Sequence, residues 1–233
     1  GAIDEERRKT MMRHHTGTHV LLHAAKEVLG PHIHQAGAQK GVESSRLDIR
    51  HFRHISEKEL QLIEDAAHRL VLNDIPVHIG WEDRTTAEQK YGFDLYQGGV
   101  PPGSRIRIVR VAGDVQACAG THCISTGQIG SVRIMRLEHV QDGIERLEFS
   151  AGMAAVAYNQ WLEGLVDAST ATLSVQRGNL PASVDRFFIE WKEQRKEIER
   201  LQRKIAELEI ASIPVEEIAG VSVTVYAVNA SPK

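Results

Sequence analysis

The chain has 233 residues, of which 42% are hydrophobic and 25% charged, a composition typical of an ordinary globular protein. Its formal net charge of −3 excludes a globally basic nucleic-acid-binding protein, so any contact with RNA would need local positive patches. No segment has the length and apolarity of a transmembrane helix, and the polar N-terminus lacks the apolar core of a signal peptide. We therefore expect no membrane association and a cytoplasmic location.

Three helices are expected in the first half of the chain. Apolar residues recur at helical spacing over residues 14–29, which predicts a helix there. Ser56 with Glu59 is typical of a capping box and predicts a second helix. Thr85 with Glu88 has the same pattern and predicts a third, short helix.

Strand patterns alternate with these helices. They cover residues 46–49, 77–81, 105–111, 114–118, 132–140 and 144–149. Asp142-Gly143, between the last two, is a strong hairpin signal. The first 150 residues therefore predict an α+β fold in which helices pack on a mostly antiparallel sheet.

The organisation changes near residue 160. Pro181 is typical of the first turn of a helix, and apolar residues then alternate spacings of three and four. This seam comprises Val184, Phe187, Trp191, Gln194, Ile198, Leu201, Ile205 and Leu208. It indicates either an amphipathic helix packed on its own domain or a coiled-coil arm that joins subunits, and the charged outer faces favour the arm. We expect one domain over residues 1–160 and a helical arm over 161–233, with a strand at 221–228.

Two short motifs carry potential metal ligands. The first is H-x-x-x-H at His15 and His19, and the second is C-x-x-x-H at Cys118 and His122. Histidines four positions apart share a helix face, and three imidazoles with one thiolate form a complete tetrahedral set for Zn²⁺. His23 continues the first ladder, so spacing alone also allows His19 to pair with His23. No glutamate follows the first histidine, which argues against an H-E-x-x-H metalloprotease.

The residues between the first two ligands suggest a binding site. Gly17 has no side chain and would let a ligand approach the helix backbone. Thr16 and Thr18 would supply hydroxyls beside the ion, although threonine also favours a helix N-terminus.

Local positive charge is present in two runs. They are Arg46, Arg50, Arg53 with His51 and His54, and Arg105, Arg107 with Arg110. Each run fits either an RNA contact or a solvated strand face, and the sequence does not separate these interpretations.

These motifs lie within longer tracts that resemble the editing domain of alanyl-tRNA synthetases. The tracts are H-T-G-T-H-V-L-L-H-A-A at 15–25, H-I-H-Q-A-G at 32–37, S-R-L-D-I at 45–49, and C-A-G-T-H with T-G-Q-I-G within 118–130. Y-G-F-D-L-Y-Q-G-G at 91–99 is similar to the archaeal type. The heptad arm resembles the start of the C-terminal oligomerisation region, so we expect a fragment of a longer synthetase, without its aminoacylation motifs.

The resemblance implies a zinc-dependent hydrolase that removes wrongly attached serine or glycine from tRNA(Ala), acting at the acceptor end. An alanine pocket cannot strongly reject either amino acid, so a second site hydrolyses the errors. The resemblance assigns the metal to His15, His19, Cys118 and His122, places Thr16 near the serine hydroxyl and puts Gln35 in the pocket wall. Four protein ligands would close the site, so we expect a structural or positioning role for the ion. The attacking water would be held partly by Thr16 and Gln35.

Alternative functions stay open at this point. One is a free-standing trans-editing protein of the same superfamily. Another is the editing domain of a threonyl-tRNA synthetase, against which the long heptad arm argues. A third is a zinc-containing module that binds tRNA without hydrolysis. The arm also predicts a possible homodimer.

Overall fold

The computed structural model describes residues 1–213 and 215–223, and it divides the chain into two compact units, Gly1–Glu163 and Gly164–Lys233. The division into an editing domain and an arm stays a functional prediction. Of the strand expected at 221–228, the described part is β9 (Val221–Val223), and residues 224–228 lie outside the described residues. No helix in the described part of the chain is long and apolar enough to cross a membrane.

The first unit contains two antiparallel sheets, so the α+β prediction is confirmed. The larger sheet has the order β1 (His34–Gln39), β2 (Ser45–Arg50), β7 (Ile144–Ala151), β6 (Val132–Gln141). The smaller sheet has the order β3 (His78–Asp83), β4 (Arg105–Val111), β5 (Asp114–Ala117). The sequence indicated one sheet, whereas the strands divide between two because each sheet packs on its own side of the first helix.

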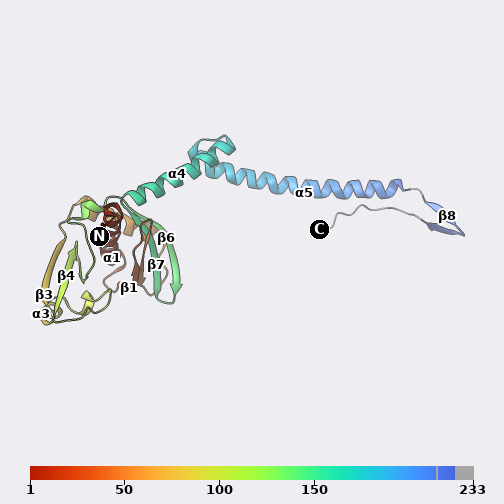
Figure 1. Ribbon diagram of the computed structural model, residues 1–233. Helices are drawn as coiled ribbons and strands as arrows, with labels where there is room; N and C mark the ends of the chain where they lie inside the picture. Colours follow the sequence, from red (N-terminus) through yellow and green to blue (C-terminus); the bar gives the residue numbers. More distant parts are fainter. Residues whose placement is uncertain (214, 224–233) are drawn as a thin grey trace. The chain divides into compact units, whose positions relative to one another are not determined.

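Helix α1 (Glu5–Leu29) lies between the two sheets (Figure 1). Helix α2 (Glu57–Leu72) packs against it, and α3 (Arg84–Tyr91) accompanies the smaller sheet. Because α1 is covered on several sides, its central turns are apolar almost all round. Their buried side chains include Val20, Leu21, Leu22, Ala24 and Ala25.

Two interactions of α1 with β7 correct or extend the sequence interpretation. A Cβ at Gly17 would lie 3.3 Å from Phe149 and 3.8 Å from Ala151. The expectation that Gly17 admits a ligand is therefore wrong: its missing side chain lets the helix approach the sheet. His14 is fully buried, bonded to the Thr10 carbonyl at 3.0 Å, and accepts from the Ala151 amide at 3.2 Å.

Local capping explains where several helices begin. The Ser56–Glu59 capping box is confirmed. Helix α1 begins at Glu5, nine positions before the first residue predicted, because the Asp4 carboxylate accepts from the Arg7 amide. Helix α3 is capped by Asp83, whose carboxylate accepts from the Thr86 amide, so the predicted cap at Thr85 is wrong.

The second unit contains most of the long helical segment. Helix α4 (Met153–Leu173) spans the boundary between the units, and it is followed by a short 3₁₀ turn, η3 (Arg177–Asn179), and by α5 (Leu180–Ser212). Pro181 occupies the first turn of α5, as predicted. A small hairpin of β8 (Glu216–Ile218) and β9 follows.

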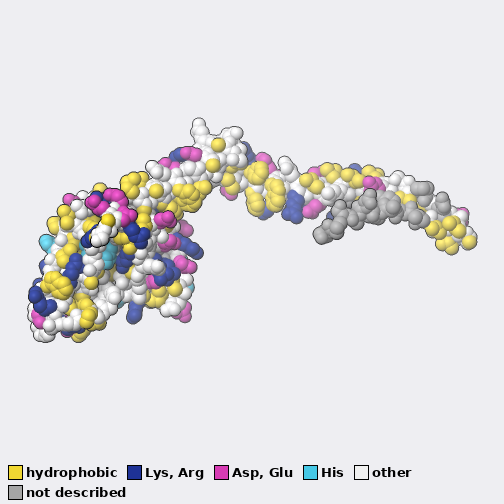
Figure 2. All heavy atoms as spheres, in the orientation of Figure 1, with side chains coloured by type: hydrophobic (Ala, Val, Ile, Leu, Met, Phe, Trp, Pro, Cys, Tyr) yellow, Lys and Arg dark blue, Asp and Glu magenta, His cyan; other side chains and the backbone are white. Residues whose placement is uncertain are grey.

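The apolar seam of α5 is exposed. None of the residues of α5 is buried, and seam side chains such as Phe187 and Leu208 are 59% and 62% exposed. Figure 2 shows these apolar side chains in groups along the helix, between charged ones. The helix therefore carries an uncovered surface that suits a partner.

The two candidate caps of α3 can be distinguished by substitution. Replacing Asp83 with Ala removes the acceptor for the Thr86 amide and should lower the free energy of unfolding by about 1 kcal/mol. Replacing Thr85 with Ala should have a smaller effect because no hydrogen bond of the described residues uses its hydroxyl. Urea denaturation followed by the fluorescence of the neighbouring Trp81 measures both. A larger loss for the Thr85 variant would contradict the cap at Asp83.

Candidate metal centre

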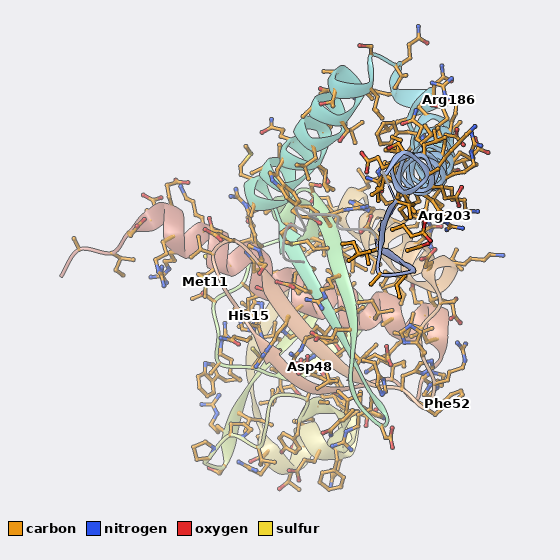
Figure 3. All side chains as sticks on the ribbon, turned by 90° about the vertical axis from the view of Figure 1, so that its right-hand side faces the viewer. Met11, His15, Asp48, Phe52, Arg186 and Arg203 are labelled. Atoms are coloured by element: carbon orange, nitrogen blue, oxygen red, sulfur yellow. The ribbon has the colours of Figure 1, made fainter. Side chains whose placement is uncertain are left out.

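Four side chains converge from two parts of the chain. His15 and His19 lie one turn apart on α1, Cys118 directly follows β5, and His122 lies four positions later. One donor atom of each lies within 4.8 Å of the others. The Cys118 Sγ is 3.3 Å from His15 Nε2 and 3.4 Å from His122 Nε2. Figure 3 shows His15 inside the first unit, well apart from Phe52.

The structure decides between the two histidine pairs that spacing left open. His23 lies against Gly113, where a Cβ would come within 2.0 Å of its ring, and its Nε2 is 3.3 Å from a carboxylate oxygen of Glu27. It therefore takes no part in the cluster, and His15 with His19 is the pair brought to Cys118 and His122.

The cluster fits a metal ion chemically. Three imidazole nitrogens and one sulfur are the borderline ligands that suit a divalent metal such as zinc. His122 Nδ1 is buried without a hydrogen-bond partner in the described residues, and His122 Nε2 faces the sulfur. The arrangement can hold a metal ion.

The neighbouring histidines favour the thiolate form of Cys118, which is the form that binds metal ions. Burial alone raises the pKa of the Cys118 thiol, but hydrogen bonds from His122, His15 and His19 outweigh burial and lower this pKa to about 3. Burial lowers the pKa of His122 to about 4 against the effect of Cys118. At neutral pH the sulfur is therefore a thiolate and His122 is neutral, which are the protonation states that bind a metal.

Asp114 holds His19 in position. Its Oδ2 is 2.6 Å from His19 Nδ1, and both side chains are almost completely buried. Burial lowers the pKa of His19, but Asp114 and Cys118 overcome burial and raise this pKa to about 9. The Gln116 amide also donates to Asp114 Oδ2 at 2.8 Å. At neutral pH His19 therefore carries a proton on Nε2, which a bound ion would have to displace. The bond from Nδ1 to Asp114 fixes the orientation of the ring, as in a carboxylate–histidine–metal site.

Sequence reasoning did not identify Asp114 or Gln116. A signal was present, because alternate residues of a strand share one face and Asp114, Gln116 and Cys118 are two positions apart. That face of β5 turns toward α1.

The loop after β5 is fixed by contacts of its own. Arg107 donates from Nη1 to the carbonyls of Cys118, at 2.6 Å, and Gly120, at 2.9 Å. A Cβ at Gly120 would lie 2.0 Å from the His15 ring, so only glycine fits beside that ligand. The backbone of the loop therefore packs directly against the ring of His15.

Thr16 connects this loop to α1. Its hydroxyl is fully buried, donates to the Met12 carbonyl at 2.9 Å and accepts from the Cys123 amide at 3.0 Å. Thr18 is also turned inward, since its hydroxyl donates to the His14 carbonyl at 2.9 Å. Both hydroxyls are engaged in backbone hydrogen bonds.

Gln35, the other predicted catalytic residue, lies on β1 and is partly buried. Its backbone amide donates to Gln97 Oε1 at 2.7 Å, and its side-chain amide donates to the Gln97 carbonyl at 3.2 Å. Within the described residues, no hydrogen bond uses Gln35 Oε1, which leaves that oxygen as a free acceptor.

The chain is similar to known proteins along its full length. A family described as the threonyl and alanyl tRNA synthetase second additional domain matches residues 106–148. The alanine–tRNA ligase of Methanoregula boonei is 61% identical over 233 residues, which are 100% of this chain and 26% of that protein.

Two further alanine–tRNA ligases agree with this result. That of Methanospirillum hungatei is 62% identical over 225 residues, 97% of this chain and 25% of that protein. That of Methanosarcina barkeri is 53% identical over 225 residues, 96% of this chain and 24% of that protein. The chain thus spans about a quarter of the length of the curated relatives it matches.

Replacing Asp114 with Asn keeps the shape of the side chain but removes the charge that orients His19. We expect metal affinity to fall about 10- to 100-fold, because carboxylates behind a ligating histidine have effects of this size. Competition against a chromophoric chelator measures the affinity. Asp65→Asn, on the exposed face of α2, is the matched control. Equal affinities for the two variants would exclude this role of Asp114.

Proposed function

Because this chain belongs to the alanine–tRNA ligase family, we propose that it is the part of such an enzyme that hydrolyses Ser-tRNA(Ala) and Gly-tRNA(Ala). The observation that carries the proposal is the assembly of His15, His19, Cys118 and His122 at one place in a chain of this family. A free-standing editing protein would perform the same chemistry, but the full-length similarity to ligases favours the ligase. The same similarity argues against a threonyl-tRNA synthetase.

We propose Zn²⁺ as the ion, held by those four side chains. Zinc bound there would supply positive charge that orients and polarises groups of the substrate. Four protein ligands close a tetrahedral site, which favours positioning over direct activation of water. Side chains around the cluster would therefore orient the attacking water and the substrate.

The two predicted catalytic side chains differ in whether they have a hydrogen-bonding group free for the substrate. Gln35 Oε1 is free to accept a hydrogen bond, so we assign it to orient the attacking water or the substrate. The Thr16 hydroxyl is engaged by Met12 and Cys123. We propose that Thr16 acts by holding the ligand loop in register with α1, which is a positioning role.

The reaction is the hydrolysis of an ester. Water attacks the carbonyl carbon of the seryl group, and the bond from that carbon to the ribose oxygen breaks. Serine leaves as a free amino acid, and the ribose hydroxyl regains a proton. The discrimination against Ala-tRNA(Ala) has to come from the amino-acid pocket, since the ester is the same in both substrates.

The two cysteines of the chain provide a matched test. Cys118→Ala should lose zinc and the hydrolysis of Ser-tRNA(Ala). Cys123→Ala should keep both, because the Cys123 side chain is buried outside the cluster. Metal analysis and the release of labelled serine measure the two effects. Ala-tRNA(Ala) is the control substrate, which the wild-type chain should not hydrolyse.

Each alternative gives a different result in this assay. Full serine release by a zinc-free Cys118 variant would contradict a role for the cluster. A wild-type chain that binds tRNA without turnover would support the non-catalytic module. Preferred hydrolysis of Ser-tRNA(Thr) would support the threonyl alternative.

We also propose that the α5 seam joins two copies of the chain. Trp191, Ile198 and Leu201 are 44%, 55% and 43% exposed and lie at heptad spacing, as the seam of a coiled coil requires. Burial of this apolar surface against a second copy would stabilise the pair.

Leu201→Lys should therefore dissociate the homodimer, because a charge would replace an apolar seam residue. Gln202→Lys, one position away and outside the seam, should leave the dimer intact. Light scattering after size-exclusion chromatography measures the mass of each variant. A wild-type chain that stays monomeric at all concentrations would contradict the proposed dimer.

A further inference from the structure

The face of the smaller sheet that carries Cys118 continues beyond the metal centre. The Cys118 amide donates to the Arg107 carbonyl at 3.0 Å, and Arg107 is in turn the register partner of Trp81 on β3. Residues that are paired across antiparallel strands point to the same face of a sheet. The side chains of Cys118, Arg107 and Trp81 therefore form one row across this face, which we call the Trp81 row.

Coverage of this face decreases from β5 to β3. Helix α1 packs against β5 and β4, where Asp114 and Val109 are buried. On β3, the side chains of Trp81 and Ile79 point to the same face but are 61% and 47% exposed. An indole ring is thus left open to solvent on the face that holds the metal centre.

The opposite face of the smaller sheet is closed. Ile106 and Ile108 of β4 are buried there against Ala87 of α3 and Leu95 of the short 3₁₀ helix η1 (Phe93–Leu95). This second core holds the sheet together without Trp81. The exposed Trp81 side chain therefore contributes little to the packing of its own sheet.

The Trp81 indole has a free ring face. Within residues 1–213 and 215–223, no hydrogen bond, ring contact or cation–π contact involves its side chain. Arg107, beside it, is directed toward the loop after β5, where its Nη1 donates to two carbonyls. Arg105 lies opposite Asp83, so the charges at this end of the strands offset each other. Stacking of a flat ring is therefore the main interaction that this surface offers, and nucleobases stack on aromatic side chains whatever their sequence.

The spacing along the Trp81 row suits one nucleotide. Neighbouring strands lie about 4.8 Å apart, so two intervals place the backbone at Trp81 roughly 10 Å from that at Cys118. A nucleobase stacked on the indole carries its ribose at one edge, and an ester on that ribose extends further in the same direction. A base at Trp81 would thus let the ester of the same nucleotide approach the His/Cys cluster.

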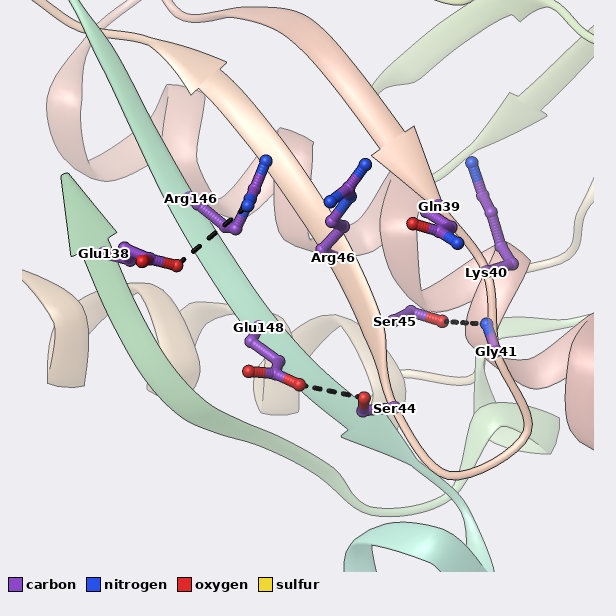
Figure 4. Close-up of a pocket in the computed structure, with 9 residues that line it drawn as sticks. All are labelled: Gln39, Lys40, Gly41, Ser44, Ser45, Arg46, Glu138, Arg146 and Glu148. Atoms are coloured by element: carbon purple, nitrogen blue, oxygen red, sulfur yellow. Dashed lines mark hydrogen bonds and ion pairs between the residues drawn. The ribbon is translucent and has the colours of Figure 1, made fainter. Parts of the chain in front are cut away.

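The polar hollow on the larger sheet differs from this face in both charge and position. It lies between the β1–β2 connection and the outer face of β7 (Figure 4). Arg146 donates there to Asp48 at 2.7 Å, and Arg46 is the register partner of Glu148. Its charges are therefore offset locally. It also lies on the side turned away from α1, since the alternate residue Leu47 points into the core.

We propose that Trp81 stacks on the terminal nucleobase of a single-stranded RNA 3′ end and so directs an ester on the terminal ribose to the metal centre. This inference rests on the proposed function, which supplies the ester. Stacking needs no excess of positive charge, so it is compatible with a net charge of −3. Trp81 is thereby a substrate-binding residue that does not touch the bond that breaks.

Variants of the full 233-residue chain test the contact. The probe is an unacylated RNA hairpin with a single-stranded 3′ end, and fluorescence anisotropy measures its affinity. Trp81→Ala should weaken binding about 5- to 100-fold, the range for the loss of one stacked base, whereas Trp81→Phe should keep most of the affinity. Phe93→Ala is the matched control and should bind like the wild type, because Phe93 is 76% exposed but lies on η1, at the closed face.

A second RNA that lacks only the terminal base locates the contact. The wild type should bind it as weakly as Trp81→Ala binds the normal RNA, and Trp81→Ala should lose nothing further, because the same contact is already absent. The slope of log affinity against log salt should be equal for the wild type and Trp81→Ala, since stacking releases no counterions from phosphates.

Three results would overturn the inference. One is normal RNA bound by Trp81→Ala as tightly as by Phe93→Ala. Another is a wild-type chain that binds the two RNAs equally or binds neither. The third is an equal loss of affinity by Trp81→Ala for both RNAs, which would separate Trp81 from the terminal base. The comparison of the two RNAs on the wild-type chain needs no substitution, and circular dichroism melting curves show that the variants are folded.

These outcomes are separate from those of the hydrolysis assay. The RNA carries no amino acid, so its affinity does not depend on turnover. Base-dependent binding through Trp81 in a chain that hydrolyses nothing would support the stacking and contradict the proposed reaction. Serine release by a chain whose RNA binding ignores the terminal base would contradict the stacking alone.

Discussion

Helix α1 is packed between two antiparallel sheets, and the position of every other part of the candidate site depends on this packing. Buried apolar side chains such as Leu21 and Leu22 fix the rotation of the helix about its axis. In the part of the helix just before them, the same rotation directs His15 and His19 toward the loop after β5. Polar groups on a helix in this environment need partners, and His14, Thr16 and Thr18 have backbone partners in place of water.

Interactions between opposite charges and close packing of the loop both hold the candidate centre together. The thiolate of Cys118 is stabilised by three imidazoles, and Asp114 supplies a second negative charge behind His19. Arg107 and Gly120 then hold the loop so close to α1 that no side chain fits beside His15.

The features predicted correctly from the sequence depend on short-range rules. The hairpin at Asp142-Gly143 and the capping box at Ser56 each depend on a few adjacent residues, and both are present. Strand β1, by contrast, lacks alternating apolar residues, so the sequence did not predict it as a strand. Its extended form depends on pairing with β2. The start of helix α4 at Met153 was not predicted either, because the helical arm was expected to begin at residue 161. Within the site, the four ligand types and their spacing were predictable. The pairing of Asp114 with His19 was not predicted, because Asp114 lies outside both spaced motifs and its contact depends on how β5 packs against α1.

The ligand order along the chain has a consequence for biosynthesis. A ribosome makes the N-terminus first, and 103 positions separate His15 from Cys118. The two histidines of α1 therefore leave the ribosome well before the cysteine that completes the set exists. During this interval only two imidazoles of the nascent chain are available to bind an ion, so its affinity for the ion is weak. All four side chains come together only after the β4–β5 hairpin has been translated and has docked, so an ion held by this set would bind late in maturation.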